Sequence, residues 1–175
     1  MILETERLLL DTWQSCDSAA FRPIATDPQV MRYITGGVAW TDEQIQSFVD
    51  RQIQQYADRG LCRWKLLDKT TNEMIGFCGV GIWRDTPLHE IGWWLAPAYW
   101  GRGLATEAAR TALRDAFERV QLDRIVSIAM PANTASTHIM KKLGLQLECE
   151  FQYDDLRLLR YAMTRDQYLA LANSR

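Results

Sequence analysis

The first half of the chain shows two kinds of hydrophobic spacing. From Leu8 to Trp13, apolar and polar residues alternate in a short run that ends in polar residues, which predicts a first strand. Between Thr41 and Gly60 the apolar residues share one helical face: Ile45, Phe48, Val49, Ile53 and Tyr56. Thr41 and Gln44 have the spacing of a capping box, and Gly60 is a usual helix stop. The pattern therefore predicts a helix over 41–60.

Three runs that read as strands follow this helix. Residues 62–67 and 74–83 are separated by the short polar segment 68–72, which indicates an antiparallel hairpin. Residues 89–95 form a third run, rich in aromatic residues and bounded by Pro97. Together the three runs predict an antiparallel meander.

The second half of the chain alternates helices and strands. Apolar residues from Ala105 to Phe117 repeat at three- and four-residue spacing, the strongest helix signal in the sequence. The remaining predicted elements are a buried strand over 124–130, a helix over 133–142 stopped by Gly144, strands over 146–153 and 156–163, and a terminal helix capped by Thr164 and Gln167. This order predicts an α+β fold with a mixed sheet and helices on both faces. A length of 175 residues without linker or repeat favours a single domain over 1–175.

Charge and hydropathy narrow the class of protein. A formal net charge of −2 argues against a nucleic-acid binder, which gains affinity by neutralising many phosphates. The segment Met1–Arg7 carries acidic residues where a signal peptide needs a basic region. No apolar run reaches the roughly 20 residues of a membrane span. We therefore expect a cytoplasmic protein that binds neither nucleic acid nor a membrane.

Cysteine and histidine positions give no sign of a metal or redox site. The cysteines are widely scattered and lack C-x-x-C spacing; they are Cys16, Cys62, Cys78 and Cys149. His89 and His138 have no partner ligand at helical spacing. We expect structural thiols, since free cysteine behaves as a small buried hydrophobe, and no bound metal.

A loop with two glycines, Trp100-Gly-Arg-Gly-Leu-Ala-Thr106, joins the third meander strand to the alanine-rich helix. A helix start offers unpaired N–H groups and partial positive charge, and glycines let an anion approach the main chain. By glycine spacing alone, a plain turn fits as well as a phosphate site. A Walker loop would need Gly-Lys-Ser/Thr, and a dinucleotide fingerprint would need a third glycine where Thr106 stands. The antiparallel strand before the loop also differs from a dinucleotide-binding fold.

This loop and its surroundings resemble the GNAT superfamily of N-acetyltransferases. The pyrophosphate motif of the superfamily, Gln/Arg-x-x-Gly-x-Gly/Ala, is similar to Trp100-x-x-Gly103-x-Ala105, with tryptophan in the first position. The longer string from Glu90 to Ala108 resembles the RimJ/RimL group, in which tryptophan is ordinary there. The likeness covers nearly the whole chain through further motifs: Leu3-Glu-Thr-Glu-Arg-Leu-Leu-Leu10, Ile75-Gly76, Asn133-x-x-Ser136, Lys142-Leu-Gly-Leu145 and Tyr161-Ala-Met-Thr-Arg165.

The resemblance implies the GNAT fold, a mostly antiparallel mixed sheet that splays at the cofactor site, and acetyl-CoA as co-substrate. It implies a pyrophosphate cradle made by backbone groups of Gly101, Arg102, Gly103, Leu104, Ala105 and Thr106. Trp93, Trp94 and Leu95 would hold the pantetheine arm by strand-like hydrogen bonds. Asn133 would bond the distal part of the cofactor, although the same side chain also suits a plain helix cap.

Transfer to an amine needs a proton acceptor, because an α-amine titrates near about 8 and a lysine near about 10.4. By resemblance to the RimJ/RimL group, Glu90 is the preferred base, acting directly or through water. An ordinary surface or paired carboxylate is the plainer interpretation of Glu90. Strand alternation places His89 on the opposite face from Glu90, so both cannot face one cleft. His89, Asp154 and Asp155 remain alternative bases.

The other roles are less sharply defined. The N–H of Leu95 is the family-like donor to the thioester oxygen. Met140 stands where many members carry a tyrosine, so Ser136 is the substitute donor for the departing thiolate, unless it only bonds the backbone near its helix start. Proximity alone could suffice if both acid and base are absent. The acceptor site would be lined by Met31, Tyr33 and Trp83, with Trp40 as a further candidate, although aromatic residues more often belong to a core.

The expected function is acetyl-CoA-dependent transfer of an acetyl group to a primary amine by direct attack in a ternary complex. The amine is either a protein N-terminal α-amine or a small-molecule amine. A non-catalytic acyl-CoA-binding module is the alternative, and it would keep the glycine loop but lack a carboxylate near the thioester. The sequence leaves open the identity of the amine, the preferred acyl-chain length, and whether the chain is a monomer or a homodimer.

Overall fold

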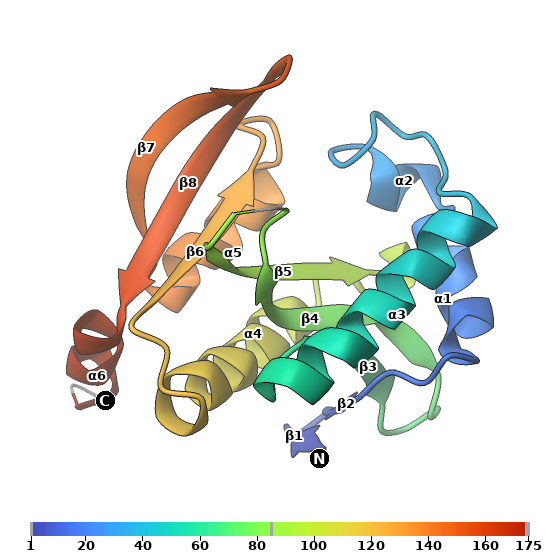
Figure 1. Cartoon of the computed structure of the whole chain (residues 1–175), viewed down its shortest axis with the longest axis horizontal. Coiled ribbons are helices and arrows are strands. Elements are labelled where there is room, and N and C mark those ends of the chain that lie inside the picture. Colours follow the sequence, from blue (N-terminus) through green and yellow to red (C-terminus); the bar gives the residue numbers. More distant parts are fainter. Residues whose placement is uncertain (1, 85, 174–175) are drawn as a thin grey trace.

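The computed structural model describes residues 2–84 and 86–173 and is built around one sheet of eight strands (Figure 1). The strands are β1 (Leu3–Glu4), β2 (Leu8–Asp11), β3 (Arg63–Asp68), β4 (Met74–Ile82), β5 (His89–Leu95), β6 (Arg124–Ala129), β7 (Gln146–Tyr153) and β8 (Leu156–Thr164). Their order in the sheet is β1-β2-β3-β4-β5-β6-β8-β7. All neighbouring pairs are antiparallel except β5 and β6, so the sheet is mixed.

Helices cover both faces of the sheet (Figure 1). They are α1 (Asp17–Ala25), α2 (Pro28–Met31), α3 (Asp42–Arg59), α4 (Leu104–Arg114), α5 (Thr134–Leu143) and α6 (Arg165–Asn173), with short turns η1 (Pro97–Tyr99) and η2 (Asp115–Arg119). On one face, Phe21 of α1 and Phe48 of α3 pack against Phe77 of β4. On the other, α4 packs across β4 and β5 with the buried alanines Ala108, Ala109 and Ala112.

The sheet opens between β5 and β6, and this is the feature that positions the candidate site. The two strands are paired at a single position, Glu90 with Val126, and Ser127 adds a side-chain hydrogen bond of 2.9 Å to the carbonyl of Ile91. Beyond that point β5 continues to Leu95 without pairing to β6. Because the strands are parallel, their carboxyl ends lie at the same edge, and the helices that follow them, α4 and α5, begin there.

Most predicted elements are confirmed. The α+β class is confirmed, and so are the capping boxes at Thr41–Gln44 and Thr164–Gln167. Gly60 and Gly144 end their helices in the left-handed conformation, with φ of 65° and 93°. Strand β1 was not predicted, since two residues carry too little pattern to recognise.

The helix over 105–117 also extends further than its apolar repeat indicates. Residues Asp115–Arg119 continue α4 as a π-helical turn. The Arg119 guanidinium pairs with Asp115 and donates to the carbonyl of Gly60 at 2.6 Å, which ties this turn to the end of α3. Within the described residues, no helix is long and apolar enough to cross a membrane.

Candidate active site

The loop before α4 forms an open cradle of main-chain groups. Gly101 and Gly103 adopt the left-handed conformation, with φ of 71° and 78°, which glycine tolerates best. No described side chain caps the first turn of α4, so the N–H groups of that turn have no side-chain partner among the described residues. A Cβ atom built on Gly101 meets nothing within 4 Å. Residues 101–106 thus combine a helix start with two left-handed glycines, an arrangement that could hold an anion such as a diphosphate.

The end of β5 presents free main-chain groups on the side where the sheet opens. The N–H of Ala96 donates to the carbonyl of Ile75 in the β4 direction at 2.8 Å. Because antiparallel pairing alternates, the main-chain groups of Trp93 and Leu95 face away from β4. The Leu95 carbonyl accepts from the Trp100 indole at 2.7 Å. Among the described residues, the N–H and C=O of Trp93 and the N–H of Leu95 have no hydrogen-bond partner across the opening, so they could bind a ligand.

Trp94 differs from its two neighbours. By the same alternation its main-chain groups face β4, where it pairs with Phe77. Its indole packs among the rings of Phe21, Trp40 and Phe48, with centroids 4.8–6.3 Å away. The structure thus places Trp94 in the aromatic core, away from the opening, whereas Trp93 and Leu95 face it.

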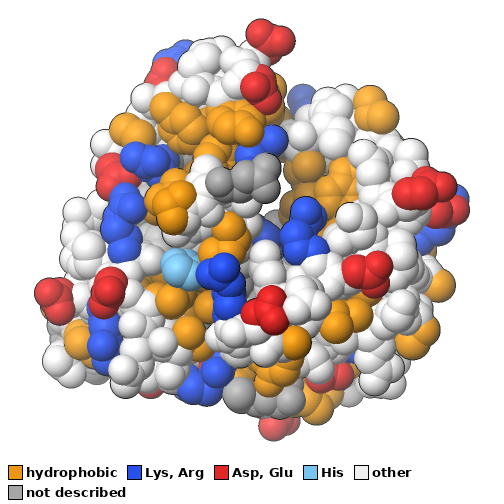
Figure 2. Space-filling model, viewed as in Figure 1, with side chains coloured by type: hydrophobic (Ala, Val, Ile, Leu, Met, Phe, Trp, Pro, Cys, Tyr) orange, Lys and Arg blue, Asp and Glu red, His pale blue; other side chains and the backbone are white. Residues whose placement is uncertain are grey.

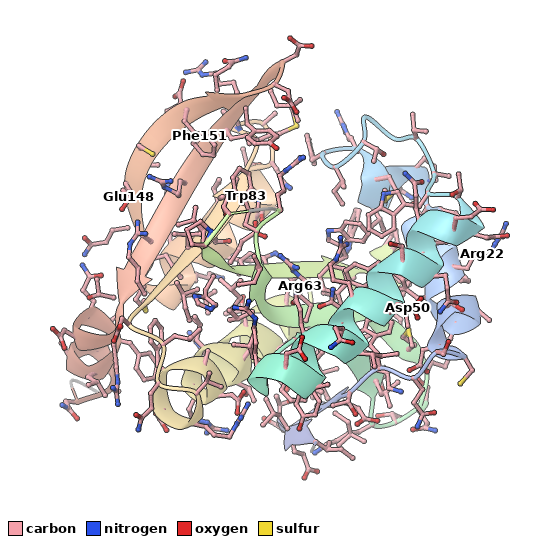
Figure 3. The ribbon with its side chains drawn as sticks, viewed as in Figure 1. Arg22, Asp50, Arg63, Trp83, Glu148 and Phe151 are labelled. Carbon is pink, nitrogen blue, oxygen red and sulfur yellow. The ribbon has the colours of Figure 1, made fainter. Side chains whose placement is uncertain are left out.

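Glu90 lies at the last position where β5 and β6 are paired, and it forms an ion pair with Arg63 of β3. The Arg63 Nη2 and Glu90 Oε2 atoms are 2.6 Å apart, and the two side chains are only 12% and 13% exposed. To reach Glu90 on β5, the Arg63 side chain crosses β4 and passes close to Gly81 of β4 and Gly92 of β5. Figure 3 shows Arg63 near the middle of the molecule, beside α3.

Burial and the charge of Arg63 shift the pKa of Glu90 in opposite directions. Burial raises the pKa of Glu90 because it disfavours the charged form. The positive charge of Arg63, its hydrogen bond, the charge of Arg84 and the N–H of Ile128 lower it, but burial is the larger effect. The net result is a carboxyl whose pKa lies above its ordinary value.

The alternative bases lie elsewhere. His89 is on the other face of β5, half-buried, and its pKa is lowered by burial and by the nearby Arg59. It lines a separate pocket with residues of the loop before β6, among them Gln121 and Asp123. Asp154 and Asp155 are exposed in the turn between β7 and β8.

Asn133 and Ser136 lie at the start of α5. The Asn133 side-chain oxygen accepts from the N–H of Ser136 at 3.2 Å, so Asn133 is the helix cap, and its amide nitrogen is left for other contacts. Ser136 is half-buried, and its hydroxyl forms no hydrogen bond with any described residue.

Of the predicted acceptor-lining residues, Met31 lies in the core, whereas Tyr33 and Trp83 are half-buried. Met31 is fully buried in the core, at 0% exposure, because the short helix α2 turns it inward, so it does not line an open surface. Tyr33 is half-buried beneath the Arg32 guanidinium. Trp83 packs edge-on against Phe151 and Tyr153 of β7 and joins the loop after β4 to the β7–β8 hairpin (Figure 3).

Figure 2 shows a hollow between the β7–β8 hairpin and the α2 region, floored by hydrophobic side chains and bordered by basic ones.

Arg63 was not predicted from the sequence as a site residue. The available signal was the pair of glycines, Gly81 and Gly92, inside strands, since a strand-interior glycine often marks the close approach of another group.

Comparison with known proteins agrees with this geometry. Residues 7–146 match the family model described as Acetyltransferase (GNAT) domain. The chain is 30% identical over 152 residues to the uncharacterized N-acetyltransferase YnaD of Bacillus subtilis (strain 168), covering 87% of this chain and 86% of that protein. A GNAT-family acetyltransferase of Bacillus anthracis superposes with a TM-score of 0.80 at 27% identity, over 95% of this chain and 99% of that one.

A more distant structure shares the fold. RimL, a ribosomal L7/L12 α-N-protein acetyltransferase solved in complex with coenzyme A, has a TM-score of 0.79 at 18% identity, over 95% of this chain and 99% of its own. The match of the family model over most of the chain decides the family. The chain belongs to the GNAT acetyltransferases, and is an acetyl-CoA-dependent N-acetyltransferase.

Proposed function

We propose that this protein transfers the acetyl group of acetyl-CoA directly to a primary amine, with Glu90 as the general base. The observation that carries the proposal is the position of Glu90. It lies where β5 and β6 separate, on the strand that leads into the 101–106 cradle. Strand β5 therefore carries a carboxyl of raised pKa and leads directly to the proposed cofactor cradle.

The cofactor would lie along the opening. The N–H groups of 101–106 fit its diphosphate, with the Arg102 side chain adding positive charge. The free groups of Trp93 and the N–H of Leu95 fit the amides of the pantetheine arm and the thioester oxygen. When bound, acetyl-CoA supplies the thioester carbon that the amine attacks. Asn133 keeps its amide nitrogen for the distal part of the cofactor while its oxygen caps α5.

Glu90 would take the proton from the amine, directly or through one water molecule. A carboxyl whose pKa is raised by burial is a better match to an amine than an exposed one, because proton transfer is most effective when the two pKa values are close. The positive charge of Arg63 lowers the pKa of Glu90 and so favours the ionised form, which the base requires. Burial makes ionised Glu90 a stronger base, and Arg63 favours the ionised form in which Glu90 can accept a proton.

Ser136 is the proposed donor to the thiolate that leaves coenzyme A. Its hydroxyl is unengaged by described residues and lies at the start of α5, at the same sheet edge as the 101–106 cradle. Transfer of the hydroxyl proton to sulfur, with return of a proton from solvent, would complete the reaction. Its contribution is expected to be smaller than that of Glu90, since a thiolate is already a good leaving group.

The acceptor amine would enter through the hollow between the β7–β8 hairpin and the α2 region (Figure 2), with Tyr33, Trp40 and Trp83 as candidate lining residues. Both acceptor classes remain in the proposal: the α-amine of a protein N-terminus, as the description of RimL gives for that protein, and a small-molecule amine. An open, partly aromatic hollow is compatible with either.

Release of free thiol from acetyl-CoA, measured against a panel of N-terminal peptides and small amines, tests this proposal. We expect turnover with at least one amine and a fall in kcat of about a hundredfold or more in Glu90→Gln, the usual size of a general-base contribution. Asp154→Asn and Asp155→Asn are matched controls, because they neutralise carboxyls in the exposed β7–β8 turn. Unchanged turnover in Glu90→Gln, with loss in either control, would move the base to the hairpin.

A further inference from the structure

The segment between β1 and β2 makes a dense set of contacts with the start of α4, far away in the sequence. The Arg7 Nε atom donates to Glu107 Oε2 at 2.7 Å, and its backbone N–H donates to Oε1 at 3.0 Å. The Thr5 hydroxyl also donates to Glu107 Oε1, at 2.6 Å. Through these bonds both oxygens of one carboxylate are held from the N-terminal segment.

Arg7 also reaches the cradle itself. Its Nη1 atom donates to the main-chain carbonyl of Arg102 at 2.9 Å. That carbonyl shares a peptide unit with the N–H of Gly103, and the planar trans peptide directs the two groups in opposite directions. Because Arg7 fixes the carbonyl on one side, the Gly103 N–H is directed away from Arg7.

The negative charge of Glu107 would repel an anion at the start of α4, and the ion pair with Arg7 offsets this repulsion. Glu107 is the fourth residue of α4, within the first turn, where its own negative charge interacts well with the helix but opposes a second anion at the same end. The Arg7 guanidinium lies 2.6 Å from Glu107 Oε2 and neutralises it locally. The pKa of Glu107 is lowered by the bonds from Thr5 and Arg7, which outweigh the effect of burial, so the carboxylate stays charged and paired.

We infer that Arg7 is a positioning residue for the diphosphate of coenzyme A. It touches no part of the cofactor; it orients the Arg102–Gly103 peptide and cancels the charge of Glu107, so that the cradle presents donors and net positive potential. The inference rests on the proposed cofactor site. The Arg7 side chain is 43% exposed, and exposed ion pairs contribute little to stability, so the effect is expected in cofactor use rather than in folding.

The test compares two acetyl donors in the full-length protein. Acetyl-CoA contains the diphosphate, and S-acetylpantetheine lacks it. In Arg7→Met we expect KM for acetyl-CoA to rise about tenfold with little change in kcat, because an uncompensated charge at a helix N-terminus and a released peptide both weaken anion binding. The kinetic constants for S-acetylpantetheine should stay within about twofold of the parent values, because no diphosphate is present to meet the changed cradle.

Two further variants sharpen the comparison. Arg22→Met removes the α1 arginine of an exposed ion pair with Asp42 of α3. Arg22 lies well away from α4 (Figures 1 and 3), so the kinetic constants for both acetyl donors should stay unchanged. Glu107→Gln in the Arg7→Met background removes the uncompensated charge, so KM for acetyl-CoA should recover in part. If Arg7→Met does not fold, Arg7→Lys replaces it. Lysine keeps the positive charge but cannot bond Glu107 and the Arg102 carbonyl together as the guanidinium does, so KM should rise less, and only for acetyl-CoA.

If KM in Arg7→Met rises equally for acetyl-CoA and S-acetylpantetheine, or rises for neither, Arg7 does not position the diphosphate. Failure of the double variant to recover any affinity overturns the charge part of the argument. If the parent protein itself uses S-acetylpantetheine as well as it uses acetyl-CoA, the proposed cradle fails, which is a different result from failure of the Arg7 inference alone.

Discussion

Gly81→Ala tests the Arg63–Glu90 ion pair without substituting either of its residues. A Cβ atom at position 81 would lie 2.6 Å from Arg63 Nη1 and 3.0 Å from Gln55 Oε1. Ordinary contact begins near about 3.5 Å, so the guanidinium must retreat by about 1 Å. The 2.6 Å bond from Arg63 to Glu90 would then stretch beyond hydrogen-bonding range. Gly81 does not need a left-handed backbone, so the substitution acts through this contact.

The magnitude follows from the bond that is lost. A charge-assisted hydrogen bond contributes about 1.5–3 kcal/mol, and an alanine in place of glycine returns about 0.4–1 kcal/mol by restricting the unfolded chain. We therefore expect a net loss of about 1–2 kcal/mol, a fall in Tm of about 3–6 °C. Gly92→Ala is the matched control on the neighbouring strand. Its Cβ would lie 3.5 Å from Arg63 Nε, an ordinary contact, and should leave Tm unchanged or slightly raised.

The same variant has a pH signature. A base must be ionised, so kcat/KM falls as pH decreases through the pKa of Glu90. Arg63 lowers that pKa, and its displacement raises it further, so the acidic limb of the profile should move to higher pH in Gly81→Ala and not in Gly92→Ala. Thermal melts and the pH dependence of kcat/KM measure the two effects. Identical Tm values and identical acidic limbs in the two variants would refute the reasoning.

Two further predictions separate catalysis from stability. Ser136→Ala should lower kcat by about tenfold while Tm stays within about 2 °C, because its hydroxyl bonds no described residue; an unaltered kcat would exclude it as the thiolate donor. Thr41→Ala should cost about 1 kcal/mol in the free energy of unfolding, since it removes the capping box of α3, and should leave kcat/KM unchanged; denaturant titration measures the first and steady-state kinetics the second.

The elements that the sequence predicted well are those with local signals. The alanine repeat of α4, the capping boxes and the glycine stops each depend on residues within a few positions of one another, and all are present in the structure. The loop over 101–106 was recognised for the same reason, because its glycines and the helix start are adjacent in the sequence.

The features that were missed depend on pairing between distant segments. Arg63 meets Glu90 only because β3, β4 and β5 are aligned so that Gly81 and Gly92 lie between them, and strand register is not visible in a single sequence. The same limit applies to Arg7 and Glu107, which are 100 residues apart. Met31 was expected to line the acceptor site but is fully buried, and a four-residue helix carries no periodic pattern that would reveal its buried face.

Coenzyme A is proposed to bind along the opening between β5 and β6, with its diphosphate on residues 101–106. Titration of the amide-labelled protein with acetyl-CoA, followed by nuclear magnetic resonance, tests this proposal most directly. We expect the largest chemical-shift changes at the amides of Gly101 to Thr106, Trp93 and Leu95, and a smaller change at Trp94, whose main chain faces β4. Shifts gathered instead around His89 and Gln121, at the pocket on the other end of β5, with none in the 101–106 loop, would contradict it.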